Sequence, residues 1–249
     1  MPKRASVARP SSLHAYVVDQ LGTAIVAGEL KPGDSVAAEE LCDRYGVSRT
    51  VVREGLRALE FVGMVSARPQ VGTTIRPFSD WDLFNPDVIR WRNRTEYALT
   101  QTRELLQVRL GIEPQAARLA AVCMDTTQRE HLERLSKQLD AALVTGDQDA
   151  NVSADIDFHL AILAGSGNSV FRRFGSMVEA MLRTRQAQDR SDTAQALDSS
   201  VALHRQLGTA IVTGDPDMAE ALSRTIVQAT LAELEPEDSS TTAPAPGSA

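Results

Sequence analysis

Hydroxyl-bearing and cationic side chains are concentrated at the start of one short segment, at Ser48, Arg49, Thr50 and Arg53. Arg49 and Arg53 are four residues apart, so a helix would place both guanidinium groups on one face. A guanidinium can donate two hydrogen bonds to guanine O6 and N7, and hydroxyl groups suit phosphates or base edges. The spacing is typical of a helix that reads DNA, although a solvated arginine face would show the same pattern.

The elements around these residues predict how they are positioned. A helix over 38–45, a turn at Gly46 and an N-cap at Ser48 precede the polar segment, which is the order of a helix-turn-helix. Apolar residues spaced three and four apart predict another helix over 13–27. Two β-prone runs, 64–68 and 73–76, flank a loop that ends at Gly72. Together they predict a winged helix-turn-helix with Gly72 at the wing tip, where its backbone could approach a groove closely.

A second set of residues could bind a metal ion or a polar ligand. Asp155 and His159 are four apart in a helical segment, and His204 lies in another. A carboxylate and imidazoles can ligate a divalent metal, but an ordinary surface pair has the same spacing. Arg109 falls within the apolar stripe of a third helix and needs a partner there. That partner is either Glu113, one turn later, or the carboxylate of a ligand.

Composition narrows the class of protein. The 249 residues are 43% hydrophobic and 24% charged, with a net charge of −7, which fits a globular protein with a real core. Residues 1–80 carry ten Lys/Arg against nine Asp/Glu, and the rest sixteen against twenty-four. The first 80 residues are thus almost neutral and the remainder is acidic. This distribution of charge favours local DNA contact by the first part over electrostatic binding of nucleic acid by the whole protein. Two cysteines, no CxxC and no long apolar run predict a cytoplasmic protein without a membrane segment.

The chain divides into a winged part and a helical part. From about residue 87 to 235 only helical periodicity is present, with breaks that leave six or seven helices. The predicted fold class is therefore mainly α, a winged helix-turn-helix with a small β-wing followed by an all-helical bundle. The predicted divisions are a flexible basic arm (1–11), a DNA-binding domain (12–77), a linker with a first helix (78–96), a helical effector-binding and dimerisation domain (97–236) and a disordered tail (237–249).

The first part resembles the winged-helix domain of the GntR transcription factors. The resemblance covers residues 13–77 and is carried by the segments 25–33, 38–41, 46–54 and 56–59 and by Gly72. It implies binding to double-stranded operator DNA. Glu39 departs from the pattern, because many members have an arginine at that position.

The second part resembles the helical FCD effector domain of the FadR branch of that family, on the segments 108–121, 155–159, 167–168 and 210–215 and on His204. The resemblance implies a bundle that encloses a small carboxylate, often with a metal such as zinc held by one Asp and three His. Asp155, His159 and His204 match three of these ligands. Ile226 occupies the position of the fourth and cannot replace an imidazole.

The resemblance implies a homodimeric transcriptional regulator, most simply a repressor on a palindromic operator. Residues 81–92 resemble the linker of gluconate and galactonate repressors, which points to a sugar acid such as gluconate as the effector. The effector would contact Arg109, Asp155, His159 and His204, directly or through their metal. Two alternatives remain at this point. One is a metal-dependent hydrolase that uses Asp155, His159 and His204, and the other is an architectural DNA-binding dimer without an effector.

Overall fold

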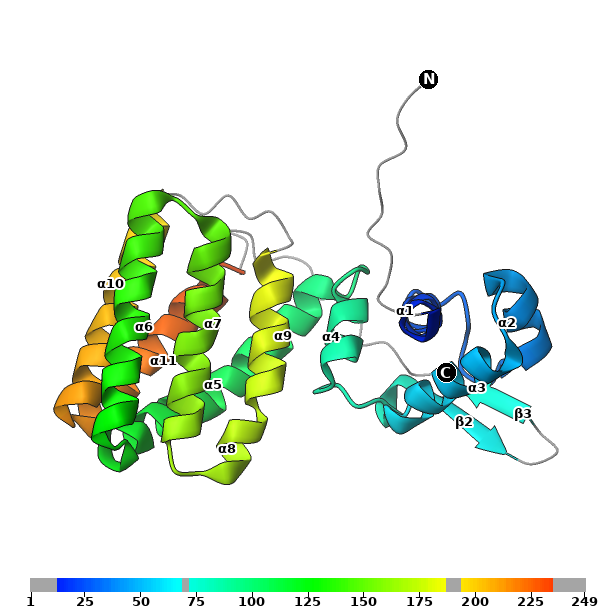
Figure 1. Cartoon of the computed structure of the whole chain (residues 1–249), viewed down its shortest axis with the longest axis horizontal. Helices are drawn as coiled ribbons and strands as arrows, with labels where there is room; N and C mark the ends of the chain where they lie inside the picture. The colour runs from blue at the N-terminus through cyan, green and yellow to red at the C-terminus, as the bar shows by residue number, and fades with distance from the viewer. Residues whose placement is uncertain (1–12, 69–71, 187–193, 235–249) are drawn as a thin grey trace, which may run out of the picture. The chain divides into compact units, whose positions relative to one another are not determined.

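A computed structural model describes residues 13–68, 72–186 and 194–234. The chain forms two compact units, residues 1–101 with 179–184 and residues 102–178 with 185–249. As predicted, the fold is mainly helical with a small sheet near the N-terminus (Figure 1). The predicted arm (1–11) and tail (237–249) lie outside the described residues. Among the described helices, none is long and apolar enough to cross a membrane.

The first unit contains the predicted winged helix-turn-helix and one further helix. Its elements are α1 (Leu13–Val26), β1 (Ser35–Val36), α2 (Ala38–Tyr45), α3 (Arg49–Phe61), β2 (Val65–Arg68), β3 (Gly72–Ile75), the 3-10 turn η1 (Phe78–Asp80) and α4 (Pro86–Arg92). The strands form an antiparallel sheet in the order β1-β3-β2. Val65 pairs with Ile75 and Arg68 with Gly72 across the wing.

The turn between α2 and α3 forms for local chemical reasons. Gly46 has a φ of 64°, the left-handed conformation in which glycine ends a helix without strain. Ser48 then begins the next helix, because its Oγ accepts a hydrogen bond from the backbone N–H of Val51 at 3.4 Å. One face of α3, with Val52 and Leu59 fully buried, packs against α1. Its opposite face, which carries the polar residues, is left in solvent.

Gly22 allows α1 and α4 to pack closely. A Cβ at this position would lie 2.4 Å from the ring of Trp91, which is buried and donates a hydrogen bond to Asp19. We expect Gly22→Ala to destabilise the protein by about 1–3 kcal/mol through overpacking. Gly111→Ala is the matched control, since Gly111 is an exposed helical glycine with open space around it. There we expect a gain of roughly 0.5–1 kcal/mol from helix propensity. Thermal unfolding should separate the two, and equal effects would contradict the packing argument.

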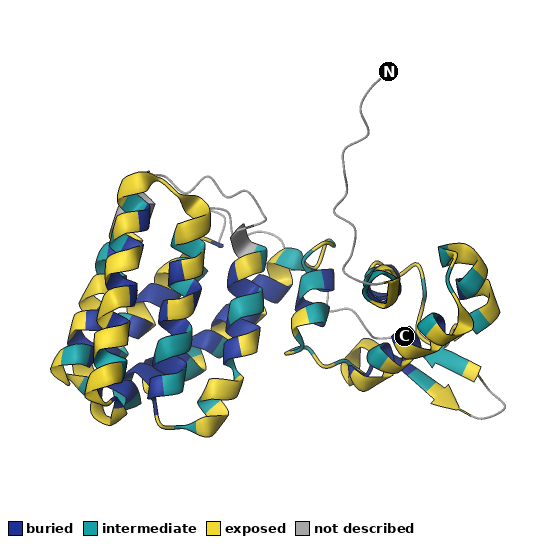
Figure 2. Cartoon of the chain, viewed as in Figure 1, coloured by how far each residue is buried: buried dark blue, intermediate teal, exposed yellow. Residues whose placement is uncertain are grey.

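The second unit is built from α5 (Ala98–Cys123), α6 (Thr126–Thr145), α7 (Gln148–Gly165), α8 (Ser169–Arg173), α9 (Gly175–Gln186), α10 (Ala194–Thr213) and α11 (Pro216–Ala232). The first four residues of α5 and the segment 179–184 of α9 group with the first unit. Several of these helices begin at a side chain that accepts from a backbone N–H, such as Asp147 and Asp215. In Figure 2 the buried residues line the inner faces of the helices.

Three helix pairs set the position of the candidate site. Helix α6 packs against both α7 and α10, and α10 packs against α11 (Figure 1). Arg129 of α6 ties the ends of two further helices together. Its Nη2 donates to the carbonyl of Ala121 at 2.7 Å and its Nη1 to the carbonyl of Val212 at 2.8 Å. A cation at the C-terminal ends of α5 and α10 is also attracted by the partial negative charge of the helix dipoles there.

Candidate functional site

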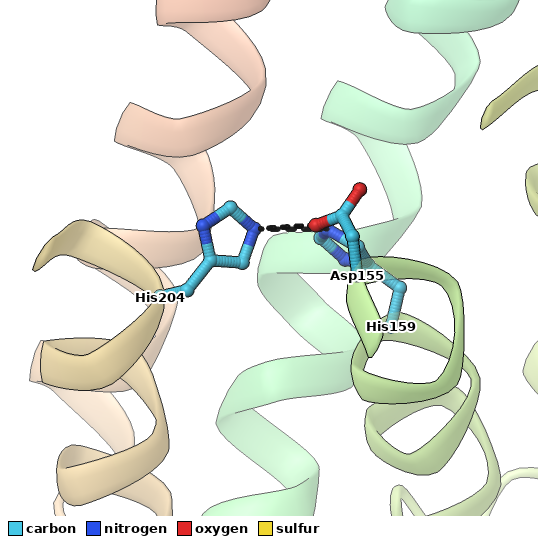
Figure 3. A group of neighbouring side chains, drawn as sticks. All are labelled: Asp155, His159 and His204. Carbon is cyan, nitrogen blue, oxygen red and sulfur yellow. Dashed lines mark hydrogen bonds and ion pairs between the residues drawn. The ribbon is translucent and has the colours of Figure 1, made fainter. Parts of the chain in front are cut away.

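Three possible metal ligands from two helices converge inside the bundle. Asp155 and His159 lie one turn apart on α7, and His204 faces them from α10 (Figure 3). Asp155 Oδ1 is 3.0 Å from His204 Nε2 and 3.5 Å from His159 Nε2, and the two Nε2 atoms are 3.3 Å apart. Both imidazoles are buried, whereas 23% of the Asp155 side chain is exposed. The structure thus brings together the three residues that the sequence marked as ligands.

The outer nitrogen of each imidazole carries a proton. His204 Nδ1 is 2.7 Å from the carbonyl oxygen of Ser200, which can only accept, so Nδ1 donates. His159 Nδ1 is 3.0 Å from Oε2 of Glu113. Burial alone would raise the pKa of Glu113, but the neighbouring charges of Arg109 and His159 outweigh it and lower the pKa to about 2. This carboxylate is therefore ionised and also accepts. In the neutral imidazoles both Nε2 atoms consequently carry lone pairs.

This arrangement places three electron-pair donors around one point. Two Nε2 lone pairs and a carboxylate oxygen would repel one another at these separations unless a cation lies among them. Arg109 Nη2, 3.3 Å from His159 Nε2, is one such cation. A proton, which makes His159 an imidazolium, or a metal ion would lie closer to all three. A carboxylate such as Glu113 behind a ligating histidine is the usual support of a protein metal site. The donor set therefore fits a divalent metal such as zinc, which favours imidazole and carboxylate ligands.

Arg109 and Glu113 form a buried ion pair beside the three ligands. Arg109 Nε lies 2.5 Å and Nη2 3.1 Å from the two carboxylate oxygens, and both side chains are at most 3% exposed. Arg109 Nη2 is also 3.3 Å from His159 Nε2. Burial opposes the charge on Arg109, but Glu113 outweighs it and raises the pKa of the guanidinium. The sequence offers Arg109 two partners, Glu113 or the carboxylate of a ligand. In the structure Arg109 pairs with Glu113.

The charges of this cluster are strongly coupled. Burial alone would lower the pKa of His159, but the charge of Glu113 and the hydrogen bond to Asp155 raise it to about 9, against the opposing charge of Arg109. Burial likewise favours protonated Asp155, yet its bonds to His159 and His204 hold the pKa of that carboxyl well below its usual value. Without a metal, the structure therefore favours a protonated His159 between two carboxylates.

Ile226 and the partners of the histidines complete the description of the site. Ile226 is buried on α11 and offers no electron pair, so among the described residues three possible protein ligands converge here. The hydrogen bond from His204 to the carbonyl of Ser200 leaves no signal in the sequence. Glu113 was visible only as a residue four positions after Arg109, and its contact with His159 depends on how α5 and α7 pack. Phe158, fully buried, sets its ring edge-on to both imidazoles.

The residues singled out for DNA contact lie on the exposed side of the first unit. Ser48, Arg49, Thr50 and Arg53 are all exposed in or beside the first turns of α3. Gly72 begins β3 with a φ of 90° and open space around it. The neighbouring residues 69–71 of the predicted wing tip lie outside the described residues.

Comparisons with known proteins agree with both halves of the fold. The gntR family of bacterial regulatory proteins matches residues 13–75, and the FCD domain matches residues 104–229. The chain is 31% identical over 221 residues to the uncharacterized HTH-type transcriptional regulator YieP of Escherichia coli, across 88% of this chain and 94% of that protein. It is 26% identical to the galactonate operon transcriptional repressor of Escherichia coli, across 88% and 95% of the two chains.

A solved structure shows the same fold at lower identity. Escherichia coli McbR/YncC superposes with a TM-score of 0.53 at 21% identity and covers 90% of this chain and 98% of its own. The matched families and relatives are transcriptional regulators, and the comparisons therefore exclude the hydrolase alternative. The chain belongs to the GntR family of bacterial regulatory proteins and is a transcriptional regulator with an FCD domain, not an enzyme.

Proposed function

We propose that this regulator is a cytoplasmic homodimeric repressor whose FCD domain binds a small carboxylate, a sugar acid such as gluconate or galactonate. The observation that carries the proposal is the buried group of Arg109, Asp155, His159 and His204 in a domain that follows a winged helix-turn-helix. A cation and metal-ligating groups side by side can bind a carboxylate together with neighbouring hydroxyl oxygens. The galactonate operon repressor among the relatives supports the choice of a sugar acid.

The DNA-binding half of the proposal assigns roles on the exposed face of α3. Arg49 and Arg53 read guanine bases in the major groove, Ser48 and Thr50 contact phosphates or base edges, and Gly72 lets the wing approach the backbone of DNA. A homodimer presents two such helices to a palindromic operator, with half-sites about one helical turn apart. Such a dimer would have one geometry that fits the operator and one that does not. The effector releases the operator by binding the second geometry more tightly than the first, and the difference between these two affinities limits the effect.

Arg49→Ala and Arg53→Ala are each expected to lose about 1–3 kcal/mol of discrimination between operator and unrelated DNA, because each removes a bidentate contact with a base. Arg57→Ala is the matched control, since Arg57 is an exposed arginine later on α3 that already pairs with Glu54 at 2.8 Å. Competition binding at fixed salt measures the effect. An equal loss on every sequence would show that Arg49 and Arg53 contact phosphates only.

A metal in the site would be held by Asp155 Oδ1 and by the Nε2 atoms of His159 and His204. When bound, it would act as a Lewis acid toward the oxygen atoms of the effector. Glu113 and Ser200 keep both Nε2 atoms available by accepting the Nδ1 protons. Ile226 has no donor atom, so water and oxygen atoms of the effector would complete the coordination of a metal at this site.

His204→Ala is expected to weaken binding of Zn²⁺ or Mn²⁺ at least about tenfold, because it removes one of three ligands. The control is His131→Ala, as His131 is an exposed histidine on α6 outside the cluster. Calorimetric titration of protein stripped with a chelator measures both variants. Unchanged affinity in His204→Ala, or an equal loss in both variants, would contradict the assigned site.

The whole proposal is tested by binding of the full chain to DNA from upstream of its own gene at fixed salt. Gluconate, galactonate and lactate are added separately, with and without the metal. We expect one sugar acid to release the DNA and Arg109→Lys to lose that response while still binding DNA, since lysine cannot replace a bidentate guanidinium. Absence of specific binding would refute the regulator. Specific binding that no acid or metal changes would favour an architectural dimer.

A further inference from the structure

An ion pair joins α2 and α3, the two helices of the helix-turn-helix. Glu39 lies in the first turn of α2, and Arg49 is the first residue of α3. Glu39 Oε1 is 3.5 Å from Arg49 Nη2, and the two side chains are 63% and 70% exposed. A pair this exposed contributes little to the stability of the free protein. Its location is more informative, because the guanidinium belongs to the face of α3 that is proposed to meet DNA.

We propose that Glu39 is a specificity-determining residue, which positions Arg49 to read a guanine. The inference rests on the proposed contact of Arg49 with DNA. A guanidinium has five N–H donors in a planar fork, and guanine O6 and N7 use two of them. A carboxylate in an ion pair with the guanidinium limits the rotation of the long side chain and so restricts the base that it reaches. Docking on DNA also removes water from the pair, which strengthens its attraction.

The same carboxylate makes incorrect complexes less stable. On a sequence without a guanine in place, Arg49 would otherwise turn to a phosphate, and Glu39 competes for it there. A negative charge beside the phosphate backbone also weakens binding that does not depend on sequence. Glu39 therefore lowers affinity for unrelated DNA while it helps the correct contact, and specificity is the difference between these two affinities.

Two other residues show what is particular to Glu39. Glu40 lies in the same turn of α2 and is also exposed. Its negative charge at the N-terminal end of the helix interacts favourably with the helix dipole, as that of Glu39 does. Within the described part of the chain Glu40 forms no ion pair with Arg49. Arg53, one turn after Arg49 on α3, has no described carboxylate within ion-pair distance. Glu40 is thus the charge-matched control, and Arg53 provides an arginine that Glu39 does not position.

The test uses the full chain and a duplex that it selects from a random-sequence pool. Dissociation constants are measured at fixed salt for this duplex, for each of its single-base substitutions and for unrelated DNA. The variants are Glu39→Gln, Glu40→Gln, Arg49→Ala and the double variant Glu39→Gln/Arg49→Ala. Circular dichroism checks that each variant is folded.

We expect both glutamine variants to bind unrelated DNA more tightly, because each removes one negative charge. Only Glu39→Gln should also reduce the preference for guanine at one position of each half-site, by about 2-fold to 5-fold, which is less than a whole Arg–guanine contact provides. The position should be the one at which Arg49→Ala loses its preference. In the Arg49→Ala background, Glu39→Gln should change that preference no further.

Three results would overturn the inference. Glu39→Gln can leave every base preference unchanged, as Glu40→Gln is expected to do. It can change a preference equally with and without Arg49, which would mean that Glu39 acts on DNA directly. Arg49→Ala can leave all preferences unchanged, which refutes both the role of Glu39 and the proposed base contact of Arg49. Selection of no sequence at all by the unaltered protein would refute the proposed function itself, and the inference with it.

Discussion

Replacing Arg109 with methionine is expected to lower the free energy of unfolding by about 3–5 kcal/mol. The reason is that Glu113, 3% exposed, would keep a negative charge inside the bundle. It would lose the guanidinium that donates a hydrogen bond to each of its two carboxylate oxygens. Methionine retains most of the buried length of the side chain, so the cavity term is small. Of the described partners of this carboxylate, the protonated His159 would then remain, at 3.0 Å.

Urea unfolding of the protein in the presence of a chelator measures this effect without a contribution from bound metal. Lys137→Met is the control, because Lys137 and Glu133 form an exposed pair with the same helical spacing, and its loss should change the stability little. The double variant Arg109→Met/Glu113→Gln should recover part of the loss, since no carboxylate is left unpaired. If Arg109→Met is as mild as the control, the pair does not stabilise the fold.

The same ion pair limits how an effector can use Arg109. Two nitrogen atoms of the guanidinium already contact Glu113, and one of these also lies beside His159. A carboxylate from outside therefore has to share Arg109 with Glu113 or displace it. Because the pair belongs to the folded core, displacement would be coupled to a rearrangement of α5. Such a coupling between ligand and helix position is what a regulator requires.

Local sequence signals predicted much of the first unit. Gly46 and Ser48 show by type alone where one helix ends and the next begins, and the structure confirms both roles. The strand Ser35–Val36 was not predicted. Two residues are too few for an alternating pattern, and the strand exists only because β3, almost forty residues later, pairs with it. Pairing over such a distance is determined by the packing of the whole unit and leaves no local signal.

The candidate site likewise contains residues that local sequence patterns predict and contacts that they do not. The spacing of Asp155 and His159 was sufficient to place them on one side of a helix, whereas His204 joined them through the family resemblance. The sequence predicts Glu113 only as a possible salt-bridge partner of Arg109. That its second oxygen accepts the Nδ1 proton of His159 depends on the rotation of α5 against α7, which the periodicity of either helix cannot give. Individual ligands can therefore be predicted from sequence, but their supporting hydrogen bonds cannot.

The metal-free protein is expected to be most stable between about pH 4.5 and 6.5. Glu113 has its pKa lowered from 4.5 to about 2, so its contribution is complete above pH 4.5 and is lost as the pH falls toward 2. His159 has its pKa raised from 6.5 to about 9, so its contribution is complete below pH 6.5 and is lost as the pH rises toward 9. A difference of one in pKa corresponds to about 1.4 kcal/mol, so each loss is on the order of 3 kcal/mol. The two groups share one interaction, and the losses are not independent.

Urea unfolding from pH 4.5 to 9 in a chelator should therefore show stability falling above pH 6.5, and His159→Gln should flatten this part of the profile. The groups that face His159 are Arg109, Glu113, Asp155 and His204, and among them Glu113 and Asp155 stabilise the proton. His131→Gln, at an exposed position, should leave the fall intact. Stability that rises or stays constant from pH 6.5 to 9 in the unaltered protein would mean that His159 is neutral. The two Nε2 atoms and Asp155 would then face one another, and Arg109 Nη2, 3.3 Å from His159 Nε2, would have to offset their repulsion in place of the proton.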